Sequence, residues 1–212
     1  MNPHIDLMQD WQRLAERAGL AMSAGLGAGL IARYTESQRA YHTCTHLRHV
    51  LGLMQEMRAD DRLLLAAWFH DAIYRPGSSD NEERSAALAR QALNAHGYPD
   101  AGIRFVCDAI LSTATHHAAD PSFHVLLDAD LAVLGGTGDE YQAYCHGIRF
   151  EYAHVPETKF REGRAGFVRS VLARPQIFQT ALCLGRFELP ARRNLQLELA
   201  ELLAPTGGRA CN

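Results

Sequence analysis

Apolar side chains recur at steps of three and four residues along almost the whole 212-residue chain. This spacing places them on one face of an α-helix, and it is clearest over residues 5–14 and 50–57. Turn-forming Pro and Gly residues interrupt the pattern at intervals. The alternation typical of a strand is confined to the short stretch Phe123–Leu127, whose flanks favour a helical turn. The sequence therefore predicts an all-α fold with nine or ten helices.

Several helix starts are visible because short polar residues precede apolar periodic segments. Thr43 or Thr45 is a suitable cap for a helix that runs to about Met57. Asp80 stands in a capping stretch followed by two glutamates, which favour the positive end of a helix. Pro156 is placed to open another helix.

The chain shows no internal repeat and no low-complexity linker, so we expect one domain over residues 1–212. Its core, at about residues 39–135, carries the candidate site developed below. C-terminal helices follow over about residues 139–205, and Arg192–Leu203 is expected to form the closing helix.

Composition excludes several classes of protein. With a net charge of −3 and a pI near 6.4, the chain lacks the excess positive charge that is typical of proteins that bind a nucleic-acid polymer. The apolar stretch Leu20–Ala32 is too short and too rich in glycine to span a membrane. The cysteines are odd in number and form no CxxC pair, which argues against a disulfide framework and favours the reducing cytoplasm. They are Cys44, Cys107, Cys145, Cys183 and Cys211.

The adjacent residues His70 and Asp71 interrupt the strongly apolar segment 66–74, which is expected to be a core helix. Burying two ionisable side chains costs several kcal/mol unless they are paired or bound to a metal. Two interpretations therefore stand with equal weight on this feature alone. One is a buried hydrogen-bonded pair, and the other is a pair of metal ligands.

Other segments also bring histidine or aspartate into apolar sequence. His42 and His46 are four residues apart and share one face if a single helix includes both. Asp128 and Asp130 lie in the apolar stretch 123–131. A mixed set of imidazole and carboxylate ligands suits manganese, iron, cobalt or zinc better than magnesium, which prefers oxygen ligands and retained water.

The order His46, His70-Asp71 and Asp130 resembles the HD superfamily of metal-dependent phosphohydrolases, in particular its small, all-helical, stand-alone members. The resemblance extends from about residue 39 to about residue 200. The other motifs that carry it are Tyr41-His42-x-x-x-His46, Trp68-Phe69-His70-Asp71, Asp80-Asn81-Glu82-Glu83, Leu127-Asp128-Ala129-Asp130-Leu131, Arg149-x-Glu151-Tyr152 and Gly163-Arg164.

The resemblance implies four ligands of one divalent metal ion: His46, His70, Asp71 and Asp130. It favours Asp130 as the distant ligand, with Asp128 orienting a ligand or a water molecule behind it. His42 and Asp71 are the candidate catalytic residues, His42 as the general acid that protonates the leaving oxygen. Related cyclic-nucleotide phosphodiesterases have an asparagine where this chain has Thr43, and this difference weakens the assignment of the general-acid role to His42.

Further residues fit the same site. His116 and His117 could bind a second ion or a phosphate group, or else cap a helix and face solvent. Tyr74, Asp80 and Glu83 could line the site, or else be a core residue and a helix start. Four basic side chains could contact phosphate oxygens: Arg48, Lys159, Arg161 and Arg164. A solvated surface is an equally good interpretation of the last three.

Together these features predict a hydrolase that cleaves a small phosphorylated substrate, a phosphomonoester or phosphodiester such as a nucleotide, with water activated by one metal ion. The expected assembly is a monomer or a homodimer. Two other functions remain open. A second ion would fit a di-iron oxygenase of the same superfamily, and a vestigial site would fit a module that binds a nucleotide or metal without turnover.

Overall fold

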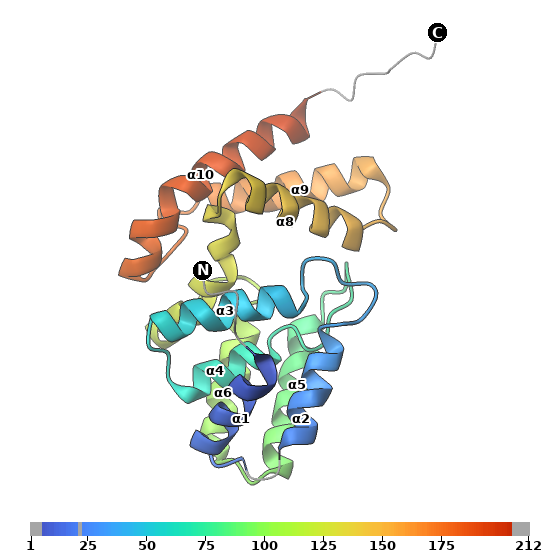
Figure 1. The fold of residues 1–212 in the computed structure, drawn as a ribbon. Coiled ribbons are helices and arrows are strands. Elements are labelled where there is room, and N and C mark those ends of the chain that lie inside the picture. Colours follow the sequence, from blue (N-terminus) through green and yellow to red (C-terminus); the bar gives the residue numbers. More distant parts are fainter. Residues whose placement is uncertain (1–5, 21–22, 205–212) are drawn as a thin grey trace. The chain divides into compact units, whose positions relative to one another are not determined.

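A computed structural model describes residues 6–20 and 23–204, and it confirms the all-α fold (Figure 1). In these two ranges it contains ten α-helices and two short 3₁₀-helices, and no strand. The predicted positions 5, 205 and Cys211 lie outside the described residues. Within the described ranges, no helix is both long enough and apolar enough to cross a membrane.

The chain divides into two compact units, Met1–Leu131 and Ala132–Asn212. We refer to them as unit 1 and unit 2. Unit 1 contains seven α-helices and one 3₁₀-helix: α1 (Leu7–Arg17), α2 (Ala24–Arg33), α3 (Cys44–Glu56), α4 (Asp61–Phe69), α5 (Asn81–Ala95), α6 (Asp100–Ser112), η1 (Pro121–Phe123) and α7 (His124–Leu131).

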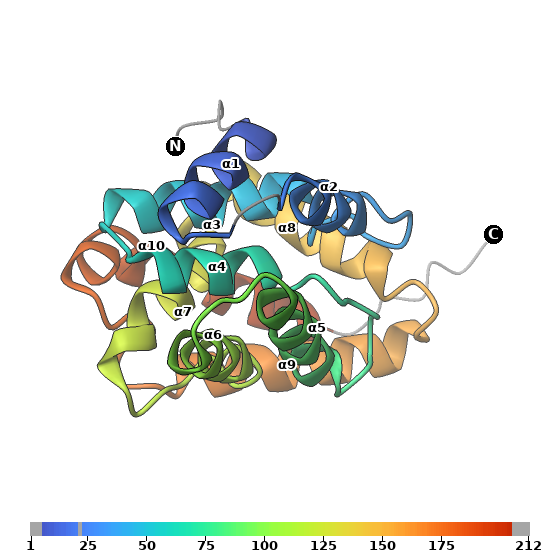
Figure 2. The ribbon, with the colours of Figure 1, turned by 90° about the horizontal axis from the view of Figure 1, so that it is seen from below.

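Helix α4 is the centre of unit 1. All residues from Leu63 to Phe69 are buried, and the helix packs against α1, α3, α5, α6 and α7. Figure 2 shows α4 between α1 on one side and α5 and α6 on the other. A helix that is apolar on every face is stable only when neighbours cover every face, so the sequence of α4 requires this position.

Caps fix where the helices that carry the candidate site begin. The Thr43 side chain accepts a hydrogen bond from the N–H of Thr45, as predicted, and α3 therefore starts at Cys44. Asp60 accepts from the N–H of Leu63 at the start of α4. Phe123–Leu127, the one strand-like stretch in the sequence, forms the end of η1 and the start of α7, which confirms the helical interpretation.

Unit 2 consists of η2 (Ala132–Gly135), α8 (Gly138–Glu151), α9 (Glu157–Leu172) and α10 (Ala181–Leu203). Pro156 precedes α9 as predicted. The closing helix starts eleven residues earlier than predicted, because Thr180 caps it and Pro190 is accommodated inside it. Gly135 lies against α10, where an added Cβ would stand 2.6 Å from the carbonyl oxygen of Phe187. No larger residue fits at that contact without displacing backbone.

Candidate metal centre

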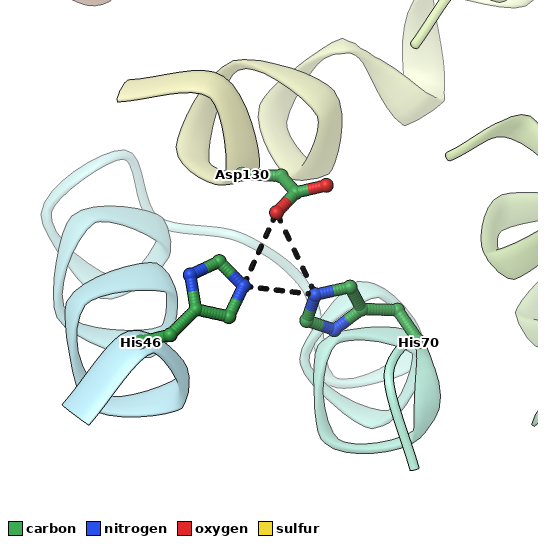
Figure 3. Close-up of side chains that lie close together, drawn as sticks. All are labelled: His46, His70 and Asp130. Carbon is green, nitrogen blue, oxygen red and sulfur yellow. Dashed lines mark hydrogen bonds and ion pairs between the residues drawn. The ribbon is translucent and has the colours of Figure 1, made fainter. Parts of the chain in front are cut away.

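Three helices of unit 1 bring His46, His70 and Asp130 together (Figure 3). His46 lies in the first turn of α3, His70 is the C-cap residue directly after α4, and Asp130 lies near the end of α7. Both histidines are buried, and the Asp130 side chain is 11% exposed. The three residues were predicted as ligands from their order in the sequence, and the fold makes them neighbours.

The ligand atoms converge on one point. The Nε2 atoms of His46 and His70 lie 3.2 Å apart, and Oδ1 of Asp130 lies 3.2 Å from the first and 3.6 Å from the second. Ligands about 2.0–2.1 Å from an ion are separated by about 3.0 Å at octahedral and about 3.4 Å at tetrahedral angles. The spacing therefore suits a small divalent cation, and this group could hold a metal ion.

The other ring nitrogens of the two histidines are also bound. Nδ1 of His70 lies 2.8 Å from the carbonyl oxygen of Ala67, which only accepts, so Nδ1 carries a proton and Nε2 is the ligand atom of the neutral ring. Nδ1 of His46 lies 3.1 Å from the hydroxyl of Tyr41. Such outer contacts fix the orientation of metal-binding imidazoles. The motif Tyr41-His42-x-x-x-His46 contains this tyrosine but does not indicate its contact with His46, because a spacing of five residues follows no helical period.

The metal-free cluster holds its charges unevenly. Burial lowers the pKa of His46 despite the nearby Asp130 carboxylate. Burial also opposes a charge on His70, but the carboxylates of Asp71 and Asp130 outweigh it and raise the pKa of His70 well above its ordinary value. Burial would raise the pKa of Asp130, yet hydrogen bonds from His116, His46 and His70 hold it well below its usual range.

Asp71 lies against the same centre. Its Oδ2 is 3.1 Å from Nε2 of His70 and 3.5 Å from Nε2 of His46, although it is not part of the mutually close group of three. The predicted position of His70-Asp71 inside a helix is wrong, because α4 ends at Phe69. The carbonyls of Asp71 and Ala72 accept hydrogen bonds from Arg39 instead of continuing the helix.

His42 lies just before α3, so it does not share a helix face with His46. Its ring instead packs against three others: Tyr41 at 4.9 Å, His46 at 5.6 Å and Tyr74 at 4.2 Å between ring centroids. Burial would raise the pKa of Asp71, but the charge of His70, together with that of His42, holds it below its usual range. The structure therefore places the ring of His42 beside that of His46, and Tyr74 against the ring of His42.

His116 reaches the cluster from the turn after α6. Its Nε2 lies 2.9 Å from Oδ2 of Asp130, the oxygen that faces away from the two histidine ligands. Its backbone has a φ of +46°, a left-handed conformation that is uncommon outside glycine. Strain of this kind is typical of functional positions. The neighbouring His117 is exposed, and the structure gives it no comparable contact.

Asp128 lies two residues before Asp130 on α7, and Arg48 lies two residues after His46 on α3. Asp128 is buried on α7, and Arg48 is half-buried on α3. At about 100° per residue, each points about 200° around its helix from Asp130 or His46.

Asp80 and Glu83 lie at the start of α5, which agrees with the simpler interpretation of that motif. Asp80 accepts a hydrogen bond from the hydroxyl of Ser78 but makes no capping bond to the helix, and Glu83 is exposed. In the part of the chain that the structure describes, neither carboxylate is hydrogen-bonded to the four predicted ligands.

Lys159 and Arg164 belong to unit 2, and both already have acidic partners there. Lys159 pairs with Glu162 on the surface, where both side chains are 72% exposed. Arg164 is buried and forms two hydrogen bonds with Glu198. Nothing in this arrangement calls for a phosphate group.

The chain was also compared with known proteins at three levels. No family model, curated protein or solved structure matches it. The function therefore has to be argued from the geometry of the cluster and from the motifs in the sequence.

Proposed function

We propose that this chain is a metal-dependent phosphohydrolase of the HD type. One observation carries the proposal: two buried imidazole nitrogens face each other at 3.2 Å, with carboxylate oxygens of Asp71 and Asp130 beside them. Such an arrangement is unfavourable without a cation or proton between the groups. The motifs that resemble the HD superfamily supply the reaction class.

The donor set favours manganese, iron, cobalt or zinc over magnesium, because two of the four donors are imidazoles. A divalent ion at such a site lowers the pKa of water towards about 7 and offsets the charge that builds on a phosphoryl group. The substrate is then a small phosphomonoester or phosphodiester, with nucleotides as the first class to test.

Other residues of the chain orient a ligand and supply a proton. Asp130 contributes Oδ1 to the cluster while His116 binds its Oδ2, so the carboxylate is held in one orientation. His42 packs against Tyr74 beside the ligands and is the candidate donor of a proton to the leaving oxygen. A general acid of this kind contributes about 10²- to 10⁴-fold to the rate.

The test is a metal analysis of protein purified without chelator or metal-affinity resin, joined to hydrolysis assays on aryl phosphomonoesters, aryl phosphodiesters and nucleotides. About one manganese, iron, cobalt or zinc per chain and metal-dependent turnover are expected. Asp130→Asn should lose both. Asp108→Asn, a change at an exposed carboxylate of α6, should lose neither. Metal-free protein that takes up no ion would overturn the proposal.

A second ion is favoured by one observation, the contact of His116 with the outer oxygen of Asp130. Two irons per chain, together with oxygen consumption in the presence of a substrate, would replace the hydrolase with a di-iron oxygenase. Tight nucleotide binding with no turnover across the metals would replace it with a binding module. The same metal analysis and assays separate these outcomes.

A further inference from the structure

Arg39 is a cation buried beside the candidate centre, in the segment between α2 and α3. Its side chain is fully buried, with 0% exposure. A buried guanidinium is costly unless all its donors are satisfied, so a chain that keeps one there gains something from its contacts. Nothing in the sequence pattern singled this residue out, because the segment around it follows no helical period.

Four acceptors surround the guanidinium, and only one is a side chain. Nε and Nη2 each donate to Oε2 of Glu36 at 3.2 Å. The other three acceptors are backbone carbonyls. Nη1 donates to the carbonyl of Asp71 at 2.8 Å and to that of His42 at 3.2 Å, and Nη2 donates to that of Ala72 at 3.4 Å.

Two aromatic rings hold the plane of the guanidinium. Its carbon lies 5.2 Å from the centroid of Tyr34 and 5.3 Å from that of Tyr74, within the range of cation–π contacts. Tyr74 also packs against the ring of His42 at 4.2 Å. The same tyrosine therefore contacts both the buried cation and the candidate acid.

The contacts of Arg39 join two segments that are distant in sequence. One segment leads into α3 and carries His42, and the other leaves α4 and carries Asp71. Carbonyls just beyond a helix end have no partner within the helix and need one from elsewhere. Arg39 supplies that partner at Asp71 and Ala72, and it binds the His42 carbonyl with the same nitrogen that binds Asp71.

We propose that Arg39 is a positioning residue, which holds the backbone of Asp71 against that of His42 and so directs both side chains to the metal centre. The inference rests on the proposed function, since it concerns the same centre. Lysine cannot replace Arg39, because an ammonium group lacks the planar fork that reaches several carbonyls and a carboxylate at once.

Cobalt(II) binding tests this role without any assay of activity. Arg39→Lys should bind cobalt about 10- to 100-fold more weakly than wild-type protein, the usual cost of losing an outer contact of a metal site. The visible absorption bands of bound cobalt should also change, since they report the ligand geometry. Far-UV circular dichroism should show that the helices are retained.

Unit 2 offers a matched control in Arg192. This residue also pairs with one glutamate, Glu188, and donates to three carbonyls around the end of α9: that of Leu172, the last residue of the helix, and those of Arg174 and Pro175. Arg192→Lys should therefore lose comparable hydrogen bonds while leaving the cobalt affinity and spectrum unchanged. Any general effect of replacing a multiply bonded arginine with lysine is measured by this variant.

The outcomes separate the two hypotheses. If wild-type protein takes up no cobalt, the metal centre is wrong and the role of Arg39 falls with it. If wild-type protein takes up cobalt and Arg39→Lys matches it in affinity and spectrum, only the role of Arg39 is overturned. Should Arg39→Lys fail to fold, Glu36→Gln decides, because Glu36 is 37% exposed and tolerates the change. A threefold or larger loss of affinity supports the inference, and an unchanged affinity and spectrum overturn it.

Discussion

Each unit of the molecule buries a cluster of charged and polar side chains, and the two clusters are built differently. In unit 2, Arg164 donates to both oxygens of Glu198, at 2.7 and 3.1 Å, and to the hydroxyl of Tyr144 at 2.7 Å. Tyr141 donates to the same carboxylate. One cation meets one anion, and each of the three guanidinium nitrogens of Arg164 meets an acceptor, so the charges balance without any added group.

The cluster of unit 1 is not complete in this sense. Its two imidazoles present Nε2 atoms to each other, and two carboxylates stand beside them. With one proton on His70, the set of four carries a net negative charge in a buried place. The comparison teaches that burial of charge alone does not indicate a functional site. A functional site is indicated by a buried set of side chains that can all bind a cation and whose donor atoms point at one centre.

The largest effect is expected in unit 2, from breaking its complete network. Glu198→Gln keeps the shape but leaves Arg164 buried beside a neutral group, and losing one member of a buried pair costs about 3 kcal/mol. Urea denaturation followed by circular dichroism should show this loss equally with and without metal. Glu162→Gln, which breaks only the exposed pair with Lys159, should change the free energy of unfolding by less than about 0.5 kcal/mol. A Glu198 variant as stable as this control would mean that the network adds nothing.

The next effect is expected in unit 1, from completing its cluster. An ion that binds only the folded chain stabilises it by about 2.7 kcal/mol when its free concentration is a hundredfold above Kd. The midpoint temperature of thermal unfolding should rise accordingly in the presence of zinc or cobalt, and it should return to the metal-free value when a chelator is added. Glu198→Gln should gain the same increment, because its network lies in the other unit. Stabilisation that persists in His46→Gln would show that the ion binds elsewhere.

The convergence of His46, His70 and Asp130 was expected because their order resembles that of the HD superfamily. The residues by themselves indicated only that histidine and aspartate in three apolar segments need partners or a bound cation. A helix cap depends on residues that are close together in the sequence, and the cap at Thr43 was therefore predicted correctly.

The rest depended on contacts that no period records. Arg39 binds the carbonyls of Asp71 and Ala72 just beyond the end of α4 at Phe69, and these residues are distant from it in sequence. The left-handed backbone of His116, which aims its ring at Asp130, belongs to a turn with no glycine to mark it. Loops are placed by tertiary contacts, and a single sequence does not contain those contacts in readable form.

A smaller effect concerns protons. In the metal-free protein His70 carries a proton because its pKa is raised, whereas His46 is neutral because burial lowers its pKa. Metal binding requires both rings neutral at Nε2, so each ion should displace one proton. Below the pKa of His70 the affinity should rise about tenfold, or about 1.4 kcal/mol, per pH unit, and above it the affinity should level off. Calorimetric titrations in buffers of different ionisation enthalpy count the protons, and a release of none or two would contradict this charge distribution.

The smallest effect tests whether stability and metal binding in unit 1 can be separated. Asp60→Ala removes the side chain that caps α4 through the N–H of Leu63, a change that costs about 1 kcal/mol. His70, at the other end of the same helix, keeps its bond from Nδ1 to Ala67, so the metal affinity should stay within about twofold. Equal losses of stability and affinity would show instead that the centre depends on the whole helix.

The pH dependence of stability tests whether the charge of Asp60 accounts for the loss in Asp60→Ala. Partial burial would raise the pKa of Asp60, but the Arg62 guanidinium and the N–H of Leu63 hold it below its usual value. A lowered pKa contributes stability that is present above the unfolded value, about 3.9, and is lost as the pH falls through the folded value. The difference between wild-type protein and Asp60→Ala should therefore be constant near neutrality and shrink below about pH 4. A difference that stays constant into acid would mean that the loss comes from packing of the side chain and not from its charge.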